Sequence, residues 1–202
     1  MILISLDFDG VIINSKNDAI KNLNKILDYI EIKKNLIIKN RKNIFNNLNG
    51  LNIEQISLKL EKQFKINSKL IKKKFDLYWK ETYKKKKINK EIVSFIKYLR
   101  LINAEIIIIS SSSKKLINKK LKENLNFPLI QIFQKKFINN RIDRRFLKKI
   151  KNQYHQFKYL IHIDDNKKIL KEFIEENFYG IFFDISNKKN KNLTLIFQNF
   201  LI

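Results

Sequence analysis

Five short apolar runs, rich in β-branched residues, constrain the fold of this chain more than any other feature. The runs are Ile2–Leu6, Ile106–Ile109, Leu129–Phe133, Tyr159–Ile163 and Ile181–Phe183. Each is nearly continuous rather than alternating, which is the pattern of strands that are buried on both faces of a parallel sheet. Helical periodicities lie between the later runs. The alternation of strand and helix predicts an α/β fold with a doubly wound parallel sheet.

One long stretch breaks this alternation. From about Ser15 to about Ile88 the apolar residues have helical spacing, as in Ile20, Leu23 and Leu27, and no run is typical of a strand. This pattern predicts a helical insert after the first strand, with the apolar faces forming the insert's own core. We therefore expect a core domain of residues 1–14 and 89–202 and an inserted helical domain of residues 15–88.

Charge and composition set broad limits on the function. The 202 residues carry 43 Lys and Arg against 19 Asp and Glu, a net charge of +24, which is compatible with nucleic-acid binding. Ile, Lys and Asn together fill half of the chain, however, so the charge reflects a general compositional bias and is weak evidence for a nucleic-acid partner. The absence of Cys fits a reducing compartment, and no apolar run approaches the roughly 20 residues that span a bilayer. We expect a soluble cytoplasmic protein without a membrane partner.

The first predicted strand ends in paired acids. Asp7-Phe8-Asp9-Gly10 follows Ile2–Leu6 directly, and a carboxylate at the carboxyl end of a buried parallel strand faces the crevice where such sheets bind ligands. Two close carboxylates repel each other and are held together most easily by a divalent cation. An EF-hand calcium loop is excluded because Ile12 stands where that loop requires Gly.

Two other predicted strands end in polar residues. Ser110 and Ser111 follow Ile106–Ile109, where a hydroxyl group and free backbone N–H groups form either an anion site or a simple helix N-cap. Asp164 and Asp165 follow the fourth run, and an N-cap would explain only one of these acids. Four carboxylates and a hydroxyl at one sheet edge predict phosphoryl transfer to a carboxylate, assisted by Mg²⁺.

These three strand ends resemble the motifs of the haloacid dehalogenase-like (HAD) superfamily, in the family's order. The matching segments are LISLDFDGVI, IIIISSSS and LIHIDDN. The helical insert is similar to the cap domain of the phosphoglycolate phosphatase and β-phosphoglucomutase subgroup. The resemblance implies a Rossmann-like catalytic core with an inserted helical cap, in which Asn49 and Gly50 would lie on a substrate-specificity loop.

The resemblance also implies a role for each matching residue. Asp7 would be the nucleophile, and Asp9 would protonate the leaving oxygen and bind the metal through its backbone carbonyl. Asp165 would be the main Mg²⁺ ligand, supported by Asp164, with Asp7 also at the metal. Ser110 would hydrogen-bond the phosphoryl group. The residues expected to touch the substrate are Phe8, Gly10, Ser111, Asn49 and Gly50.

The family's third motif supplies a cation, and this sequence offers no clear counterpart. The candidates are Lys135, Lys136, Arg141, Arg144 and Arg145, of which we prefer Lys136. The two histidines, His155 and His162, are expected in surface or core roles because the chemistry needs no imidazole.

The function predicted is a Mg²⁺-dependent phosphatase of a small phosphorylated metabolite that acts through an aspartyl phosphate. A sugar phosphomutase of the same superfamily is one alternative. Another is a basic nucleic-acid-binding protein, or an inactive family member, that keeps the fold.

Overall fold

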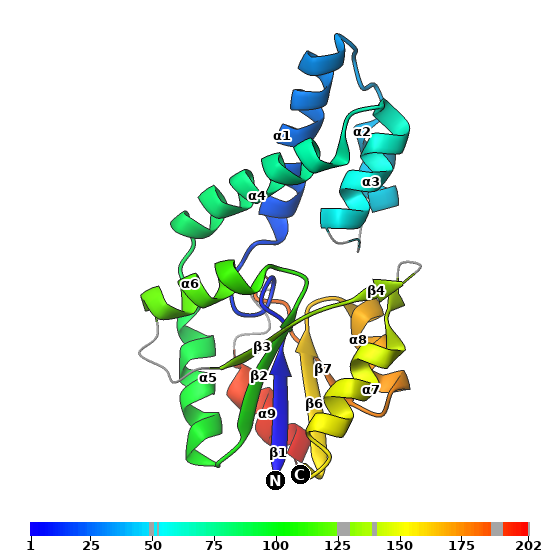
Figure 1. Ribbon diagram of the computed structural model, residues 1–202. Helices are drawn as coiled ribbons and strands as arrows, with labels where there is room; N and C mark the ends of the chain where they lie inside the picture. The colour runs from blue at the N-terminus through cyan, green and yellow to red at the C-terminus, as the bar shows by residue number, and fades with distance from the viewer. Residues whose placement is uncertain (49–50, 52, 125–129, 139–140, 187–191, 202) are drawn as a thin grey trace. The chain divides into compact units, whose positions relative to one another are not determined.

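The computed structural model describes residues 1–202 except 49–50, 52, 125–129, 139–140, 187–191 and 202. The chain folds into two compact units, one of residues Met1–Asn14 and Lys86–Ile202, the other of Ser15–Lys85 (Figure 1). None of the described helices combines the length and apolar character needed to cross a membrane.

The first unit is built on a five-stranded parallel sheet, which confirms the predicted α/β fold. Its strands are β1 (Ile2–Leu6), β2 (Glu105–Ser110), β3 (Gln131–Gln134), β6 (Tyr159–Asp164) and β7 (Tyr179–Phe182). They lie in the order β3-β2-β1-β6-β7, and every neighbouring pair is parallel. The central strand β1 is therefore flanked by β2 and β6, so the ends of these three strands meet at one edge. Part of the third predicted run, Leu129, lies outside the described residues.

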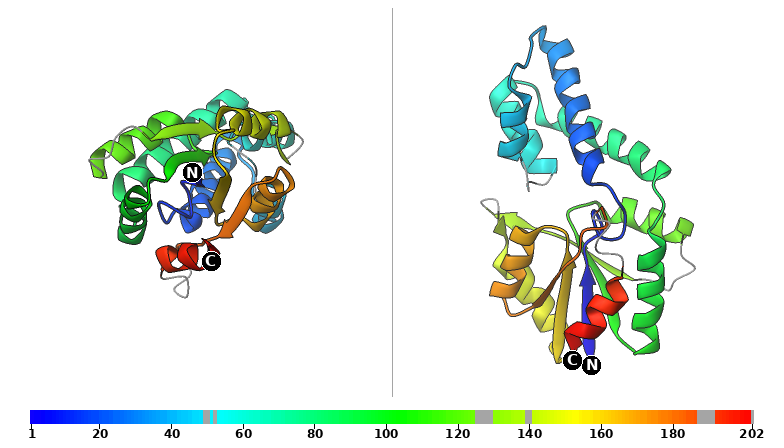
Figure 2. Two further views of the ribbon diagram at one scale, coloured as in Figure 1. Left: turned by 90° about the horizontal axis from the view of Figure 1, so that it is seen from below. Right: turned by 180° about the vertical axis from the view of Figure 1, so that it is seen from behind.

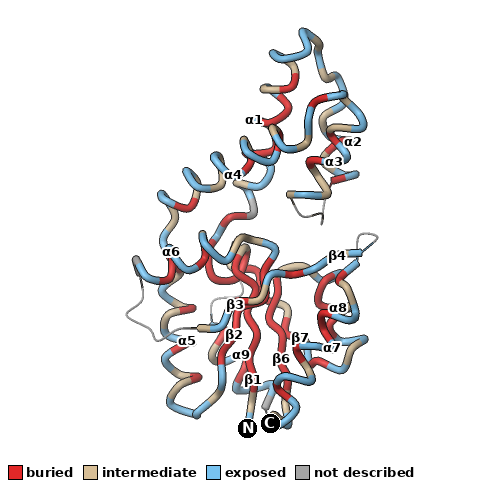
Figure 3. Tube along the Cα trace, in the orientation of Figure 1, coloured by how far each residue is buried: buried red, intermediate tan, exposed pale blue. Residues whose placement is uncertain are grey.

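Helices cover both faces of this sheet (Figure 2), which explains why the strands are apolar without alternation. Helices α7 (Arg144–Gln153) and α8 (Lys167–Glu175) pack on one face, in a core that includes Leu3 of β1 and Phe173 of α8. Helices α5 (Lys90–Leu101) and α9 (Leu193–Leu201) pack together beside the other face, where the rings of Phe95 and Phe197 meet edge to face. The strand interiors are accordingly buried (Figure 3).

Polar residues mark where the helices of this unit begin. The side chains of Asn89, Asp143 and Asn166 accept hydrogen bonds from backbone N–H groups in the first turns of α5, α7 and α8. Helix α6 (Lys114–Asn124) follows β2. A short antiparallel pair, β4 (Phe137–Ile138) and β5 (Arg141–Ile142), lies between β3 and α7 and was not predicted from the sequence.

The described part of the second unit is helical. It contains α1 (Lys16–Lys34), α2 (Arg41–Leu48), α3 (Ile53–Phe64) and α4 (Ser68–Lys85). Its buried apolar residues form a core of their own, which includes Leu27, Leu60 and Phe75. Arg41 ties α2 to α1 through ion pairs with Asp28 and Glu31 at 2.7 and 2.6 Å.

Candidate active site

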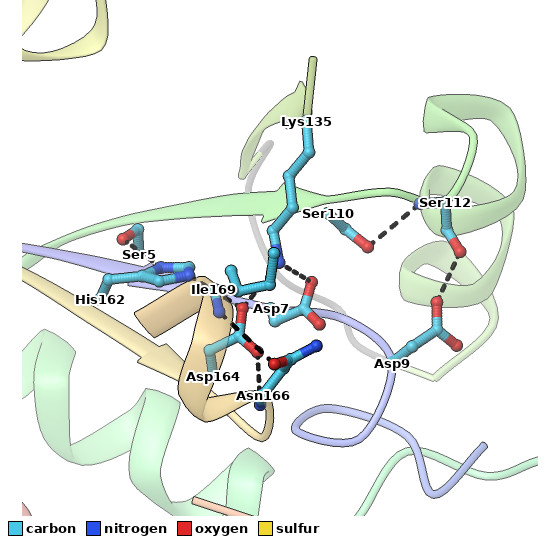
Figure 4. A network of polar contacts seen from close by, with 10 residues as sticks. All are labelled: Ser5, Asp7, Asp9, Ser110, Ser112, Lys135, His162, Asp164, Asn166 and Ile169. Atoms are coloured by element: carbon cyan, nitrogen blue, oxygen red, sulfur yellow. Dashed lines mark hydrogen bonds and ion pairs between the residues drawn. The ribbon is translucent and has the colours of Figure 1, made fainter. Parts of the chain in front are cut away.

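The ends of β1 and β6 bring Asp7 and Asp164 together at the carboxyl edge of the sheet (Figure 4). The backbone N–H of Asp7 donates to the carbonyl of Ile163 at 2.9 Å, so the β1–β6 pairing continues one residue past the strand. Both side chains are almost completely buried, with exposed fractions of 11% for Asp7 and 1% for Asp164. The sheet therefore holds two carboxylates side by side in a region where their charges are poorly solvated.

Lys135 provides the positive charge between these acids. Its Nζ atom lies 2.7 Å from Asp164 Oδ2 and 3.1 Å from Asp7 Oδ1, and its side chain is 3% exposed. The Lys135 backbone N–H donates to the carbonyl of Ser110 at 2.8 Å, which extends the β2–β3 pairing and fixes the residue beside β2. The loop after β3 thus delivers a buried ammonium group to the end of β1.

This geometry corrects our choice of Lys136 as the cation. Lys136 is exposed, because successive side chains of an extended segment point to opposite sides and its neighbour Lys135 is the one that points inward. Arg141 is also exposed. Arg144 pairs with Glu175 and Glu176, and Arg145 with Asp143, so these arginines lie in ion pairs at helix ends.

Burial and charge act in opposite directions on these groups. Burial raises the pKa of Asp7 well above its usual value, and the nearby acids add to this effect against the attraction of Lys135. Burial also opposes ionisation of Asp164, but Lys135 and a hydrogen bond from His162 outweigh it and hold the pKa of Asp164 below its usual range. The two carboxylates raise the pKa of Lys135 despite its burial, so its side chain is an ammonium ion.

Three carboxylates at this edge fit a divalent cation. One oxygen from each of Asp7, Asp164 and Asp165 lies within 4.8 Å of the others. Asp7 Oδ1 is buried and forms an ion pair with Lys135 at 3.1 Å, but no well-oriented hydrogen bond reaches it from the described residues. Mg²⁺ prefers hard oxygen ligands of this kind, and a single ammonium does not balance three acids. The side chain of Asp9 is not part of the cluster.

Gly10 leaves room for the third carboxylate. Its φ angle is +86°, a conformation that residues with a side chain rarely adopt, and a Cβ atom there would lie 2.3 Å from the carboxylate carbon of Asp165. Glycine is therefore required at position 10 both by the backbone conformation and by the space that Asp165 takes up. Asp165 can occupy its place only because residue 10 has no side chain.

Replacing Gly10 with alanine should weaken Mg²⁺ binding and lower Tm. The added methyl group displaces Asp165 and strains the backbone by about 1–2 kcal/mol, which corresponds to a Tm lower by roughly 2–8 °C. Calorimetric titration with Mg²⁺ and a thermal unfolding scan measure the two effects. Gly180→Ala is the control, because the nearest atoms that a Cβ would meet there belong to the apolar side chains of Ile174 and Leu170 and not to a carboxylate, so it should mainly change Tm. Unchanged Mg²⁺ affinity in Gly10→Ala would contradict this role.

The residues after β2 organise the remaining side chains. Ser110 is 1% exposed, and its Oγ accepts a hydrogen bond from the Ser112 N–H at 3.2 Å. Ser112 Oγ donates to Asp9 Oδ2 at 2.5 Å, so the Asp9 side chain lies toward Ser112 and α6 in Figure 4. The hydrogen bond between Ser112 and Asp9 was not predicted, although Ser112 belongs to the run of four serines that follows the second predicted strand. Ser111 is exposed.

The other predicted substrate residues are placed only in part. Phe8 is fully buried, so its side chain belongs to the core and only its backbone can face a ligand. Its carbonyl accepts hydrogen bonds from the N–H groups of Ile12 and Ile13, both at 3.0 Å, which close a tight loop after β1. Asn49 and Gly50 lie outside the described residues.

His162 is a polar core residue that contacts the site, a contact the sequence analysis missed. Its Nε2 lies 3.1 Å from Asp164 Oδ2 and its Nδ1 lies 2.8 Å from Ser5 Oγ. Burial lowers its pKa, against the opposing effect of Asp164, which favours a neutral ring. His155 is exposed.

The arrangement suits attack by a carboxylate on a phosphoryl group. Asp7 is at the strand end, a buried ammonium lies 3.1 Å from one of its oxygens, and two further acids offer a cation site. A phosphoryl group beside Asp7 would meet positive charge where its own negative charge needs balancing.

No protein-family model matches the sequence, and no curated protein matches it significantly. Solved structures do match. A protein assigned as a HAD hydrolase, YfnB of Bacillus subtilis, solved with magnesium, has a TM-score of 0.65 at 14% identity, covering 100% of this chain and 99% of its own. A predicted phosphoglycolate phosphatase from Haemophilus somnus has a TM-score of 0.65 at 14% identity, with coverage of 89% and 84%. A β-phosphoglucomutase from Clostridium difficile has a TM-score of 0.63 at 18% identity, with coverage of 94% and 87%. The chain therefore has the HAD hydrolase fold, as the sequence motifs predicted.

Proposed function

We propose that this protein is a Mg²⁺-dependent phosphatase that hydrolyses a small phosphorylated metabolite through an aspartyl phosphate on Asp7. The observation that carries the proposal is the Lys135 ammonium, buried between Asp7 and Asp164 at the end of the central strand. A buried cation against an acid cluster is costly to desolvate, and such groups concentrate at functional sites.

Two displacement steps follow from this placement. A carboxylate oxygen of Asp7 attacks phosphorus while the bond from phosphorus to the substrate oxygen breaks, and Asp9 gives its proton to that leaving oxygen. Water then attacks the aspartyl phosphate, Asp9 takes the proton of the water, and phosphate leaves with Asp7 restored. Asp9 must first release the hydrogen bond from Ser112 that holds it in the structure.

The other residues of the edge stabilise the transferring group. Lys135 balances the negative charge shared by the phosphoryl oxygens and Asp7, and the Ser110 hydroxyl donates a hydrogen bond to one of those oxygens. Asp7, Asp165 and the backbone carbonyl of Asp9 would hold Mg²⁺, with Asp164 in support. The ion would supply positive charge at the phosphoryl oxygens and reduce the repulsion among the acids.

We expect the helical unit of residues 15–85 to determine substrate choice, because its sequence resembles the family's cap domain. Asn49 and Gly50 are the proposed substrate contacts in it. A small phosphorylated metabolite is proposed because the helical insert resembles the cap domain of the phosphoglycolate phosphatase and β-phosphoglucomutase subgroup.

Removing the metal should abolish phosphate release. Assays of a panel of phosphorylated sugars and small acids with Mg²⁺ should show turnover of at least one compound, and an excess of a chelator should reduce it to background. Restoring Mg²⁺ should restore the rate, while Ca²⁺, with its larger coordination sphere, should restore little of it. Turnover that persists in chelator would contradict the proposed metal dependence.

A phosphomutase is the second candidate, supported by the likeness to β-phosphoglucomutase described above. It would use the same nucleophile and return the phosphoryl group to a sugar instead of water. Product analysis with sugar phosphates separates the two, since a phosphatase releases inorganic phosphate and a mutase forms an isomer.

A further inference from the structure

A chain of buried hydrogen bonds leads from the sheet interior to the candidate site. His162 and Asp164 are two residues apart on β6, so their side chains lie on the same face. Ser5 stands opposite His162 in the register of β1 and β6. The exposed fractions of Ser5, His162 and Asp164 are 1%, 0% and 1%, so bulk solvent does not reach these side chains. Figure 4 shows this row of side chains ending at Lys135 and Asp7.

The protons of this chain can be assigned from its partners. Asp164 Oδ2 accepts a hydrogen bond from Lys135 at 2.7 Å and carries negative charge, so the His162 nitrogen 3.1 Å away must bring a proton to it. The Ser5 hydroxyl has one proton and two acceptors within reach, His162 Nδ1 at 2.8 Å and the carbonyl oxygen of Ile161 at 3.2 Å. With the His162 proton on Nε2, Nδ1 of the neutral ring is an acceptor and makes the shorter of these two contacts. The alternative tautomer would set a ring lone pair against the Asp164 carboxylate.

The ring itself is held in place. The His162 ring stacks on Phe173 of α8 with 3.6 Å between centroids and 16° between planes. On its other oxygen, Asp164 accepts the backbone N–H of Asn166 at 2.8 Å. Asp164 is thus fixed by three donors on different elements, namely Lys135, His162 and the turn after β6.

We propose that His162, supported by Ser5, is a positioning residue for the candidate active site. Its Nε2–H fixes the Asp164 carboxylate, and that carboxylate sets the position of the Lys135 ammonium beside Asp7. The expected effect of His162 on turnover rests on the proposed function. The hydrogen-bond chain does not, because it is present in the folded protein whatever reaction the site performs. Partners of this kind around a site typically change metal affinity or activity by about 10–100-fold when they are removed.

The tautomer of His162 tests the chain without any enzymatic assay. The protein contains two histidines, so isotope-labelled histidine gives two sets of ring signals in nitrogen NMR, and a His155→Gln variant assigns them. At neutral pH, His162 should carry its proton on Nε2, and this proton should exchange slowly with water. A His162 ring with its single proton on Nδ1 would overturn the proposal.

Two variants at position 162 test the consequence. His162→Phe keeps a ring against Phe173 and removes the donor, whereas His162→Gln keeps an N–H donor of about the same reach. We expect kcat to fall about 10–100-fold in His162→Phe with KM nearly unchanged, and most of the loss to be restored in His162→Gln. Equal losses in the two variants, or wild-type turnover in His162→Phe, would contradict a positioning role.

Metal binding and a milder variant complete the test. Calorimetric titration should show weaker Mg²⁺ binding in His162→Phe than in His162→Gln, whether or not the protein is a phosphatase. Ser5→Ala deletes only the hydroxyl group and should lower kcat less than His162→Phe does. If the wild type shows no turnover but His162 has the expected tautomer and His162→Phe binds Mg²⁺ more weakly, the proposed function fails and the positioning role stands. Unchanged Mg²⁺ affinity in His162→Phe would refute the positioning role instead.

Discussion

Lys135→Met should reduce phosphate release by about 10²–10³-fold, which is the usual effect of removing one group that stabilises transition-state charge. The substitution keeps much of the side-chain volume and removes the ammonium that lies 3.1 Å from Asp7 Oδ1 and 2.7 Å from Asp164 Oδ2. Without it, the phosphoryl group must approach Asp7 against uncompensated negative charge. Steady-state assays with the best substrate of the panel measure the loss, which should fall mainly on kcat.

The same variant should unfold at lower temperature when no metal is added. Breaking a buried ion pair by removing one partner costs about 3–5 kcal/mol, which for a chain of this size lowers Tm by roughly 6–20 °C. Added Mg²⁺ should raise the Tm of Lys135→Met more than that of the wild type, because the ion replaces part of the missing positive charge.

Lys136→Met is the matched control for this result. The same substitution one residue later removes an exposed charge, so it should change stability by less than about 0.5 kcal/mol and leave turnover intact. If Lys136→Met loses activity and Lys135→Met keeps it, the assignment of the cation to Lys135 is wrong.

Asp7→Asn should abolish turnover, with a loss of 10⁴-fold or more expected for a missing nucleophile, on the order of the losses seen when covalent machinery is removed. The amide keeps the shape of the side chain but is a poor nucleophile. Phosphate release in the presence of Mg²⁺ measures the effect. Asp143→Asn is the control, since asparagine also caps helices and Asp143 begins α7 away from the acids.

Stability should respond to Asp7→Asn in the opposite sense from Lys135→Met. Burial raises the pKa of Asp7 in the folded state, so near neutral pH its ionised form destabilises the folded protein. This cost is absent below the ordinary pKa of an aspartate and grows as the pH rises from there to the raised folded pKa. Removing the charge should leave Tm in metal-free buffer unchanged or higher. A variant that loses both activity and stability would indicate that Asp7 serves the fold and not the chemistry.

The sequence was sufficient to predict where the acids converge. Continuous apolar runs followed directly by Asp7, Ser110 and Asp164 determine both the parallel sheet and the edge at which polar groups gather, since all parallel strands end on the same side. The choice between Lys135 and Lys136 needed the structure. This choice depends on the residue at which β3 ends and on the backbone hydrogen bond from the Lys135 N–H to the carbonyl of Ser110. Neither can be predicted from the sequence, because both candidates are lysines in a lysine-rich chain.

The side-chain contacts that hold the acids in place also could not be predicted from the sequence. The pairing of Ser5 with His162 follows from the register of β1 and β6, and strands separated by about 150 residues carry no local signal of register. The bond between Ser112 and Asp9 depends on how the turn after β2 folds toward the loop after β1. In both cases the sequence contains the polar residue, but it does not indicate which side chain that residue contacts.

The most direct test of the whole account is to trap the covalent intermediate. A single turnover with the best substrate and Mg²⁺, stopped in acid and analysed by tandem mass spectrometry of the N-terminal peptide, should show a phosphoryl group on Asp7. Asp7→Asn should show none. Turnover by the wild type with the phosphoryl group on another residue, or equal phosphate release by Asp7→Asn, would contradict the account.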